Sequence, residues 1–262
     1  MKIAFVPSTF LPWVGGAEIQ THNTANKMVE LGHEVDIVNV QSPVEILQKI
    51  NNFSPDFVHI QYDDFIELYP YVQYPCAITS HFGYIEQPNK WDYYGDRIAK
   101  PFERIKPNVF CLSPGIADTY LINLGIPHER LFVTPNGVNL DKFKVESIPE
   151  KLSDSIYLAK IDYRKRQHIF QSISSLHFAG NNADPNFNTS NNYLGEWTKE
   201  HLYENLTEYG NLVLLSDGEA HPLVCMEALA AGLGLVISEF ATANLDLTKE
   251  FITVIPENKI ND

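Results

Sequence analysis

Two glutamates, Glu219 and Glu227, lie eight positions apart in a segment whose residue types could bind a polar ligand. Residues 212–215 are a short apolar run between polar residues, which predicts a buried strand. Pro222 suits the first position of a helix, because its missing N–H group costs nothing there. Glu219 therefore falls in a loop between strand and helix, and Glu227 falls about two turns further along.

The order strand, acidic turn, helix, strand predicts one unit of a parallel α/β sheet. Ligands of such sheets bind where a strand ends and the next helix begins, because free N–H groups and the helix dipole favour an anion there. Carboxylates beside an anion site suit a ligand that carries both phosphate and hydroxyl groups, and a nucleotide sugar is such a ligand. The alternative, that Glu219 and Glu227 are solvated surface residues, stays open on spacing alone.

The same spacing disfavours the carboxylate pair of a glycosidase. On one helix, a rise of ~1.5 Å per residue would place the two glutamates ~12 Å apart, beyond the separation that hydrolysis uses.

A second group of charged residues is basic and follows a strand predicted over residues 156–159. Lys160 and Lys165 are five positions apart, and Arg164 and Arg166 flank the second lysine. Cations directly after a strand, at the same sheet edge as the acidic turn, could neutralise a diphosphate. The alternative is a solvated basic run.

The first forty residues repeat the pattern, with a strand predicted over residues 3–6 and a helix over residues 17–31. Gly15 and Gly16 precede that helix, where glycine lets a ligand approach the backbone and the helix end can face a diphosphate. A turn that merely needs positive φ is the alternative. The three spaced glycines of the dinucleotide fingerprint are absent, which argues against a dehydrogenase.

Two other polar groups follow predicted strands in the first half of the chain. His81 follows a strand at residues 77–80, and a lone histidine there could be structural or catalytic. Asp63 and Asp64 follow a strand at residues 57–61. Because the sequence offers no third ligand beside them, the two aspartates indicate a solvated loop rather than a metal site.

Composition restricts the partners and the location of the chain. The net charge of −14, from 19 basic and 33 acidic residues, argues against nucleic acid as a partner. Cys76, Cys111 and Cys225 lack the spacing of a disulfide framework or a zinc site, so we expect buried thiols. There is no apolar run of transmembrane length and no secretory signal, which makes the cytoplasm the expected location.

Residues 88–106 mix basic and aromatic side chains. Such a segment could touch the surface of a membrane, where lipid-linked acceptors reside, so a peripheral location at the cytoplasmic membrane face is one expectation. An ordinary solvated helix is the other.

Several of these segments, taken in order, resemble the family 4 retaining glycosyltransferases, which have the GT-B fold. They are FLPWVGGAEIQTHNTANKMVELGHEV, LFVTPNGVNLDKF, the pair Lys160 and Lys165, and EAHPLVCMEALAAG with its two glutamates. The resemblance implies an α/β protein with two Rossmann-like domains facing across a cleft. We expect these domains over residues 1–146 and 147–262, joined by a polar linker at residues 144–154. The second domain is expected to be compact or truncated, because the C-terminal helices of the family are missing.

The resemblance also implies an activity: transfer of a sugar from a nucleotide-diphosphate sugar to an acceptor hydroxyl, on a glycan or a lipid-linked molecule, with retention of configuration. It implies neither a metal nor a cofactor. The leaving diphosphate would be stabilised by Lys160, Lys165 and the backbone at His221, Pro222 and Leu223.

The remaining roles are implied by the same resemblance. Glu219 would hold hydroxyls of the transferred sugar, and Glu227 would hold the ribose hydroxyls. Gly15 and Gly16 would let the phosphates approach the first domain, and His81 would orient the acceptor or the sugar.

The sequence departs from the family pattern at two basic positions. The family usually has arginine where Lys160 stands and glycine where Arg166 stands, and the first change loses a bidentate guanidinium. These departures and the short second domain motivate an alternative function, a GT-B module that binds a nucleotide sugar or an assembly partner without turnover.

Overall fold

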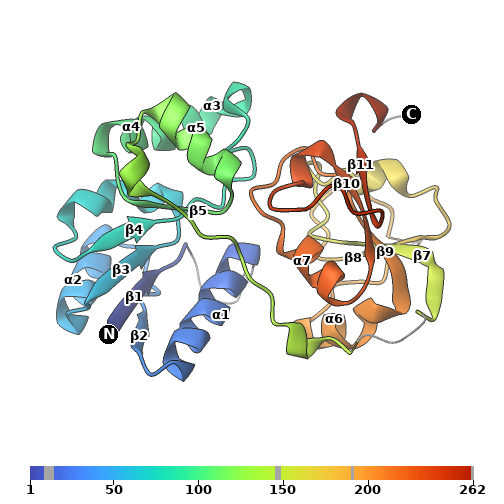
Figure 1. Ribbon diagram of the computed structural model, residues 1–262, viewed down its shortest axis with the longest axis horizontal. Coiled ribbons are helices and arrows are strands. Elements are labelled where there is room, and N and C mark those ends of the chain that lie inside the picture. Colours follow the sequence, from blue (N-terminus) through green and yellow to red (C-terminus); the bar gives the residue numbers. More distant parts are fainter. Residues whose placement is uncertain (9–14, 145–148, 190–191, 261–262) are drawn as a thin grey trace. The chain divides into compact units, whose positions relative to one another are not determined.

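The computed structural model of the 262-residue chain describes residues 1–8, 15–144, 149–189 and 192–260 (Figure 1). The chain divides into two compact units, Met1–Asn136 and Gly137–Asp262. Each unit holds one parallel sheet. The boundary predicted between residues 146 and 147 stays a prediction, and residues 145–148 of the predicted linker lie outside the described residues.

Unit 1 contains a six-stranded sheet in the order β2-β1-β3-β4-β5-β6. Its strands are β1 (Lys2–Val6), β2 (Glu34–Ile37), β3 (Phe57–Ile60), β4 (Cys76–Ile78), β5 (Val109–Cys111) and β6 (Leu131–Val133). Its helices are α1 (Gly16–Glu30), α2 (Pro43–Phe53), α3 (Asp92–Tyr94), α4 (Lys100–Ile105) and α5 (Pro114–Leu124), with the 3₁₀ helix η1 (Asp63–Tyr71) after β3.

Helices cover both faces of this sheet, as expected for parallel strands that read as continuous apolar runs. Ile3 and Phe5 of β1 pack against Ala25 of α1. Figure 1 shows α1 and α2 on opposite sides of the strands. The strand order reverses between β1 and β3, so the loops that follow these two strands diverge at the carboxyl edge, where ligands of such sheets bind.

Unit 2 repeats the design with five strands in the order β11-β10-β9-β7-β8. The strands are β7 (Lys151–Leu158), β8 (Leu176–Ala179), β9 (Tyr209–Leu214), β10 (Gly234–Ser238) and β11 (Ile252–Ile255), and the α-helices described are α6 (Lys199–Asn205) and α7 (Leu223–Ala230). The strand order reverses between β7 and β9.

Two sequence-based boundaries in unit 2 are wrong, and one pairing explains both. β7 begins at Lys151, inside the segment expected to be a linker, and β9 begins at Tyr209, three residues before the strand predicted over residues 212–215. Lys151 pairs with Tyr209 in the sheet, and its ammonium group is 2.5 Å from Glu208. These residues are more than fifty positions apart, so local composition could not reveal the pairing.

The three cysteines are free and buried, as predicted from their spacing.

Gly180, which follows β8, provides a test of the carboxyl edge of unit 2. Its φ is +145°, and a Cβ atom there would lie 1.9 Å from the carbonyl oxygen of Ala159. We expect Gly180→Ala to lower the free energy of unfolding by about 2–5 kcal/mol. The cost of the positive φ and the cost of the steric clash with Ala159 add up in this variant. The measurement is urea denaturation.

Gly195→Ala is the matched control for that variant. Gly195 also has a positive φ, +82°, but a Cβ atom there would meet nothing within 4 Å. It should therefore cost only the backbone strain, about 1–2 kcal/mol. Equal losses in the two variants would contradict the described close approach.

Candidate active site

Lys165 and Glu219 form an ion pair at the carboxyl ends of β7 and β9. The strand order reverses between these two strands, which is the position where doubly wound sheets bind their ligands. The two side chains are only 13% and 11% exposed. The structure thus brings together two residues that lie 54 positions apart and that the sequence analysis assigned to one site.

Tyr157 of β7 holds the loops that carry this ion pair. Its hydroxyl donates to the backbone carbonyl of Lys165 and accepts the N–H of Leu215 at 2.9 Å. Burial raises the pKa of this fully buried phenol well above its usual value, so the hydroxyl keeps the proton that it donates. The sequence analysis missed Tyr157, because nothing local separates it from an ordinary core tyrosine.

The basic residues Lys160 and Arg166 differ in their contacts. Lys160 is exposed, and among the described residues its ammonium group has no ion-pair partner. Arg166 has a φ of +59°, which explains why glycine suits this position in the resembling family. Its guanidinium binds both carboxylate oxygens of Glu257, at 2.9 and 2.5 Å. Arg166 is therefore committed to the segment after β11.

Glu227 lies on α7 with its side chain 8% exposed, and it forms an ion pair with Lys199 of α6. A buried carboxylate needs such a partner, because desolvation penalises an isolated charge. Glu227 is thus not the solvated residue that spacing alone allowed. Lys199 was missed by the sequence analysis, since a single lysine at the start of a helix carries no signal of its own.

The start of α7 adds backbone donors to the same edge of unit 2. His221 is buried, Pro222 is the N-cap residue, and Leu223 is the first helical residue. No side chain caps this helix end, and no acidic residue lies in its first turn. Burial lowers the pKa of His221, which favours the neutral ring. The helix end therefore presents N–H groups and the positive end of the dipole without a local counter-charge.

The corresponding helix end in unit 1 is occupied by a carboxylate. The N–H of Gly15, which precedes α1, donates to Oε2 of Glu18 at 2.9 Å, and Ser8 Oγ donates to Oε1 at 2.5 Å. A diphosphate that approached Gly15 and Gly16 would have to displace Glu18. Residues 9–14 of the family-like segment lie outside the described residues.

His81 follows β4 at the carboxyl edge of unit 1. Its Nε2 atom is buried, and no described residue forms a hydrogen bond with it. Burial lowers the pKa of His81 to about 4, although the charge of Glu18 acts in the opposite direction. The imidazole is therefore neutral near pH 7 and can accept or donate one hydrogen bond without carrying charge.

The prediction of a solvated loop is wrong for Asp63, which begins η1 and is 9% exposed. Its Oδ2 atom accepts a hydrogen bond from Ser80 Oγ at 2.8 Å. Burial raises the pKa of Asp63 to about 7. Asp64, in contrast, binds Arg97 at 2.9 Å. The sequence could not separate the two neighbours, because their exposure depends on how η1 packs.

The basic residues of segment 88–106 are largely engaged within unit 1. Each of four contacts an acidic or aromatic partner: Arg97 with Asp64, Lys100 with Asp96, Arg104 with Glu67, and Lys90 over the ring of Tyr84. These contacts reduce the positive charge that the segment offers to an anionic surface.

Among the described residues, no group of three or more His, Cys, Asp or Glu side chains is placed to hold a metal ion. No helix within the same residues is long and apolar enough to cross a membrane.

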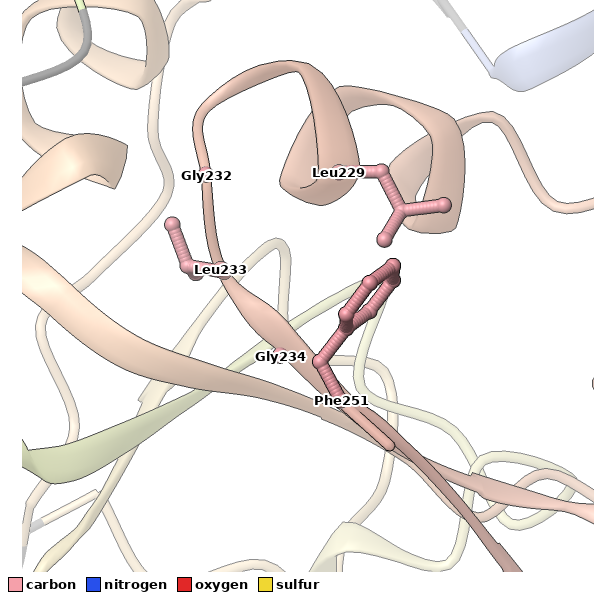
Figure 2. Close-up of a pocket in the computed structure, with 5 residues that line it drawn as sticks. All are labelled: Leu229, Gly232, Leu233, Gly234 and Phe251. Carbon is pink, nitrogen blue, oxygen red and sulfur yellow. The ribbon is translucent and has the colours of Figure 1, made fainter. Parts of the chain in front are cut away.

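An apolar cavity of about 350 Å³ lies elsewhere in unit 2 (Figure 2). It is lined by Leu229, Gly232, Leu233, Gly234 and Phe251, and Figure 2 shows the side chains of Leu229 and Phe251 pointing toward one another. These residues lie near the end of α7, at the start of β10 and just before β11, at the amino edge of the sheet. The cavity is thus separate from the carboxyl edge that carries Lys165 and Glu219.

Comparison with solved structures shows the fold. Anabaena HepE, solved in complex with UDP and glucose, has a TM-score of 0.72 at 15% identity, covering 100% of this chain and 88% of that one. WaaG, a glycosyltransferase involved in lipopolysaccharide biosynthesis, has a TM-score of 0.73 at 15% identity, covering 99% and 87%. Sucrose-phosphate synthase from Thermosynechococcus elongatus has a TM-score of 0.72 at 15% identity, covering 99% and 88%.

At this level of identity the similarity establishes the fold alone. The predicted α/β class with two Rossmann-like sheets is confirmed as that of GT-B glycosyltransferases. No protein-family model matches the sequence, and no curated protein matches it either. Membership of family 4 stays a prediction.

Tyr157 provides the first test of the site. We expect Tyr157→Phe to lower the free energy of unfolding by about 1–3 kcal/mol, because the buried N–H of Leu215 loses its acceptor. Tyr71→Phe is the control, since Tyr71 is 68% exposed and should change stability by less than about 0.5 kcal/mol. Urea denaturation measures both, and equal effects would contradict the role of the Tyr157 hydroxyl.

Asp63 provides the second test, through the pH dependence of stability. Its pKa is about 7 in the folded protein against an ordinary value of 3.8, so the unfolded chain releases this proton first as pH rises. The contribution of Asp63 to the free energy of unfolding should therefore fall between pH 4 and pH 7, by up to about 4 kcal/mol. Asp63→Asn should remove this decline.

The quantity to measure is the difference in free energy of unfolding between wild type and Asp63→Asn across that pH range, because contributions of other groups cancel in it. A difference that stays constant with pH would show that Asp63 titrates normally.

Proposed function

We propose that the protein is a glycosyltransferase that moves a sugar from a nucleotide-diphosphate sugar to an acceptor hydroxyl. The observation that carries this proposal is the Lys165–Glu219 pair at the strand-order reversal of unit 2, beside the uncapped start of α7. A cation and free N–H groups suit a diphosphate, and a carboxylate next to them suits sugar hydroxyls. HepE, which has the same fold, was solved with UDP and glucose.

The donor is proposed to displace the internal ion pair. Lys165 would exchange the carboxylate of Glu219 for a phosphate oxygen, and Lys160 and the backbone at residues 221–223 would add to the stabilisation of the leaving diphosphate. Glu219, once released, would accept hydrogen bonds from hydroxyls of the sugar. Glu227 is proposed to bind the ribose hydroxyls, with Lys199 compensating its charge.

The finer features of the reaction are part of the proposal. Transfer would retain the anomeric configuration, as in the resembling family 4 enzymes. Lys165 and the α7 N–H groups would supply the positive charge that a metal provides in other transferases. Neutral His81 is proposed to orient the acceptor or the sugar by a hydrogen bond.

The acceptor is proposed to be a glycan or a lipid-linked molecule handled in the cytoplasm. Peripheral membrane contact through residues 88–106 stays a prediction. Several of the ion pairs in that segment would have to open for its basic side chains to reach lipid phosphates.

A second candidate function is a GT-B module that binds a nucleotide sugar without turnover. The position usually occupied by arginine is Lys160, and Arg166 is committed to Glu257. This leaves Lys165 and Lys160 to neutralise the diphosphate, without the bidentate contact that an arginine would make.

Isothermal titration with a panel of nucleoside diphosphates and their sugars, followed by detection of transfer or slow hydrolysis, distinguishes the two functions. Binding with turnover supports the transferase. Binding without turnover supports the module, and no binding of any member would refute both.

Two variants test the exchange of partners at Lys165. Lys165→Ala should weaken diphosphate binding by about tenfold or more, because it removes a charge-assisted contact in a nearly buried site. Glu219→Gln should bind the bare nucleoside diphosphate at least as tightly as wild type, because it removes the competing carboxylate, yet it should abolish transfer.

The control is Lys249→Ala, because the side chain of Lys249 is 53% exposed and pairs with Asp246 at 3.3 Å. It should leave both binding and transfer unchanged. Full transfer activity in Glu219→Gln would remove Glu219 from the mechanism, and unchanged affinity in Lys165→Ala would mean that Lys165 does not bind the diphosphate.

A further inference from the structure

Asp63 and Ser80 form a buried polar contact directly beside His81. Ser80 is 2% exposed and donates to Oδ2 of Asp63 at 2.8 Å. The other carboxylate oxygen of Asp63, Oδ1, is also buried and has no hydrogen-bond partner among the described residues. Ser80 and Tyr94 are the hydroxyl donors near this carboxyl group, and both are neutral, so burial of the ionised form of Asp63 costs free energy.

The same contact fixes the chain on both sides of His81. Ser80 Oγ accepts the N–H of Phe82 at 3.2 Å, so one hydroxyl bridges the residues before and after the histidine. The ring of Phe82 stacks on Tyr94 of α3, with 4.0 Å between centroids and an interplanar angle of 3°. The hydroxyl of Tyr94 is in turn 3.3 Å from Ser80 Oγ.

The His81 ring, in contrast, lacks a described contact of its own at Nε2. The backbone that carries this ring is held by the Asp63–Ser80 contact and by the Phe82–Tyr94 stack.

We propose that Asp63 is a positioning residue that acts through Ser80 to hold His81 in the orientation needed for transfer, and that this hold depends on pH. The link to transfer rests on the function proposed above, whereas the link between Asp63 and His81 rests on the geometry alone.

The charge of Asp63 changes near neutral pH, because burial raises its pKa to about 7. His81 has a pKa of about 4 and stays neutral over the same range. Ionised Asp63 accepts only, so Ser80 must donate to it, and the hydroxyl oxygen remains available to Phe82 N–H. Protonated Asp63 is a weaker acceptor and can itself donate to Ser80, which loosens the bridge.

Other titratable groups face Asp63 from its own helix and from the elements packed on it. They are Tyr62 and Asp64 from the same segment, Tyr94 of α3 and Tyr120 of α5. The pKa of each of the three tyrosines is raised, mainly by burial, so these phenols stay neutral near pH 7. Asp64 is bound by Arg97 at 2.9 Å, which keeps a cation next to it and not next to Asp63.

The test follows the imidazole of His81 by NMR in the full chain with labelled histidine. The chain has 9 histidines, and His81→Gln assigns the signal. The wild-type His81 signal should shift with a midpoint near pH 7, although its own ring does not titrate there. Asp63→Asn should abolish that shift, and Ser80→Ala should reduce it by breaking the bridge.

Asp64→Asn is the matched control, because it neutralises the neighbouring aspartate and leaves Asp63 in place. It should keep the shift, with a somewhat lower midpoint, because the charge of Asp64 adds to the effect of burial in raising the pKa of Asp63. A shift that persists in Asp63→Asn, that is lost equally in Asp64→Asn, or that is missing from wild type would overturn the proposal. If Asp63→Asn does not fold, an unchanged shift in Ser80→Ala would overturn it.

Kinetics supply the second measurement. Wild-type kcat should fall about tenfold from pH 8 to pH 6 as Asp63 gains its proton, and kcat of Asp63→Asn should lose this step. The affinity for nucleoside diphosphate, which residues of unit 2 are proposed to bind, should match wild type. Absence of transfer in wild type would refute the proposed function, while the NMR shift would still decide the role of Asp63.

Discussion

The ion pair between Lys165 and Glu219 is the interaction on which the proposed site depends. It joins the loops after β7 and β9, where the sheet of unit 2 reverses its order, and both side chains are almost buried. A buried ion pair is not an efficient source of stability, because desolvation offsets much of the attraction. It is, however, a way to keep a cation and a carboxylate ready for a ligand that carries both phosphates and hydroxyls.

The surroundings of the pair explain why it can serve that role. Tyr157 holds the backbone of Lys165 and of Leu215, so the loops stay in place when the side chains change partners. The guanidinium of Arg166 binds Glu257, so Lys165 and Lys160 are the cations left to contact a ligand at this site. At this edge of the sheet the charges of Lys165 and Glu219 balance each other, in a chain whose net charge is −14.

Burial, rather than neighbouring charge, sets the protonation states at the carboxyl edge of unit 1. His81 is held neutral, and Asp63 is brought into the range where it titrates near pH 7. Burial thus raises the pKa of the acid and lowers the pKa of the base, because desolvation disfavours whichever form of a group is charged.

Much of the fold could be predicted because parallel strands are local apolar runs. The α/β units could be identified from the apolar runs at β1, β3, β9 and β10 and from the glycine and proline residues at helix ends. Knowledge of which strands pair was not needed. Glu219 and Lys165 could be assigned to one site because both follow a strand. Tyr157, Lys199 and Asp63 could not be found, since their roles depend on residues that are close in space and distant in sequence. The strand predicted at residues 156–159 was shorter than β7 for the same reason. The first residues of β7 are polar, and only their pairing with β9 identifies them as part of a strand.

A crystal structure of the protein with a bound nucleoside diphosphate tests the central claim most directly. The account predicts that the diphosphate lies within hydrogen-bond distance of Lys165 Nζ and of the first N–H groups of α7, with Glu219 released from Lys165. A diphosphate bound elsewhere, while the Lys165–Glu219 pair remains intact, would contradict it.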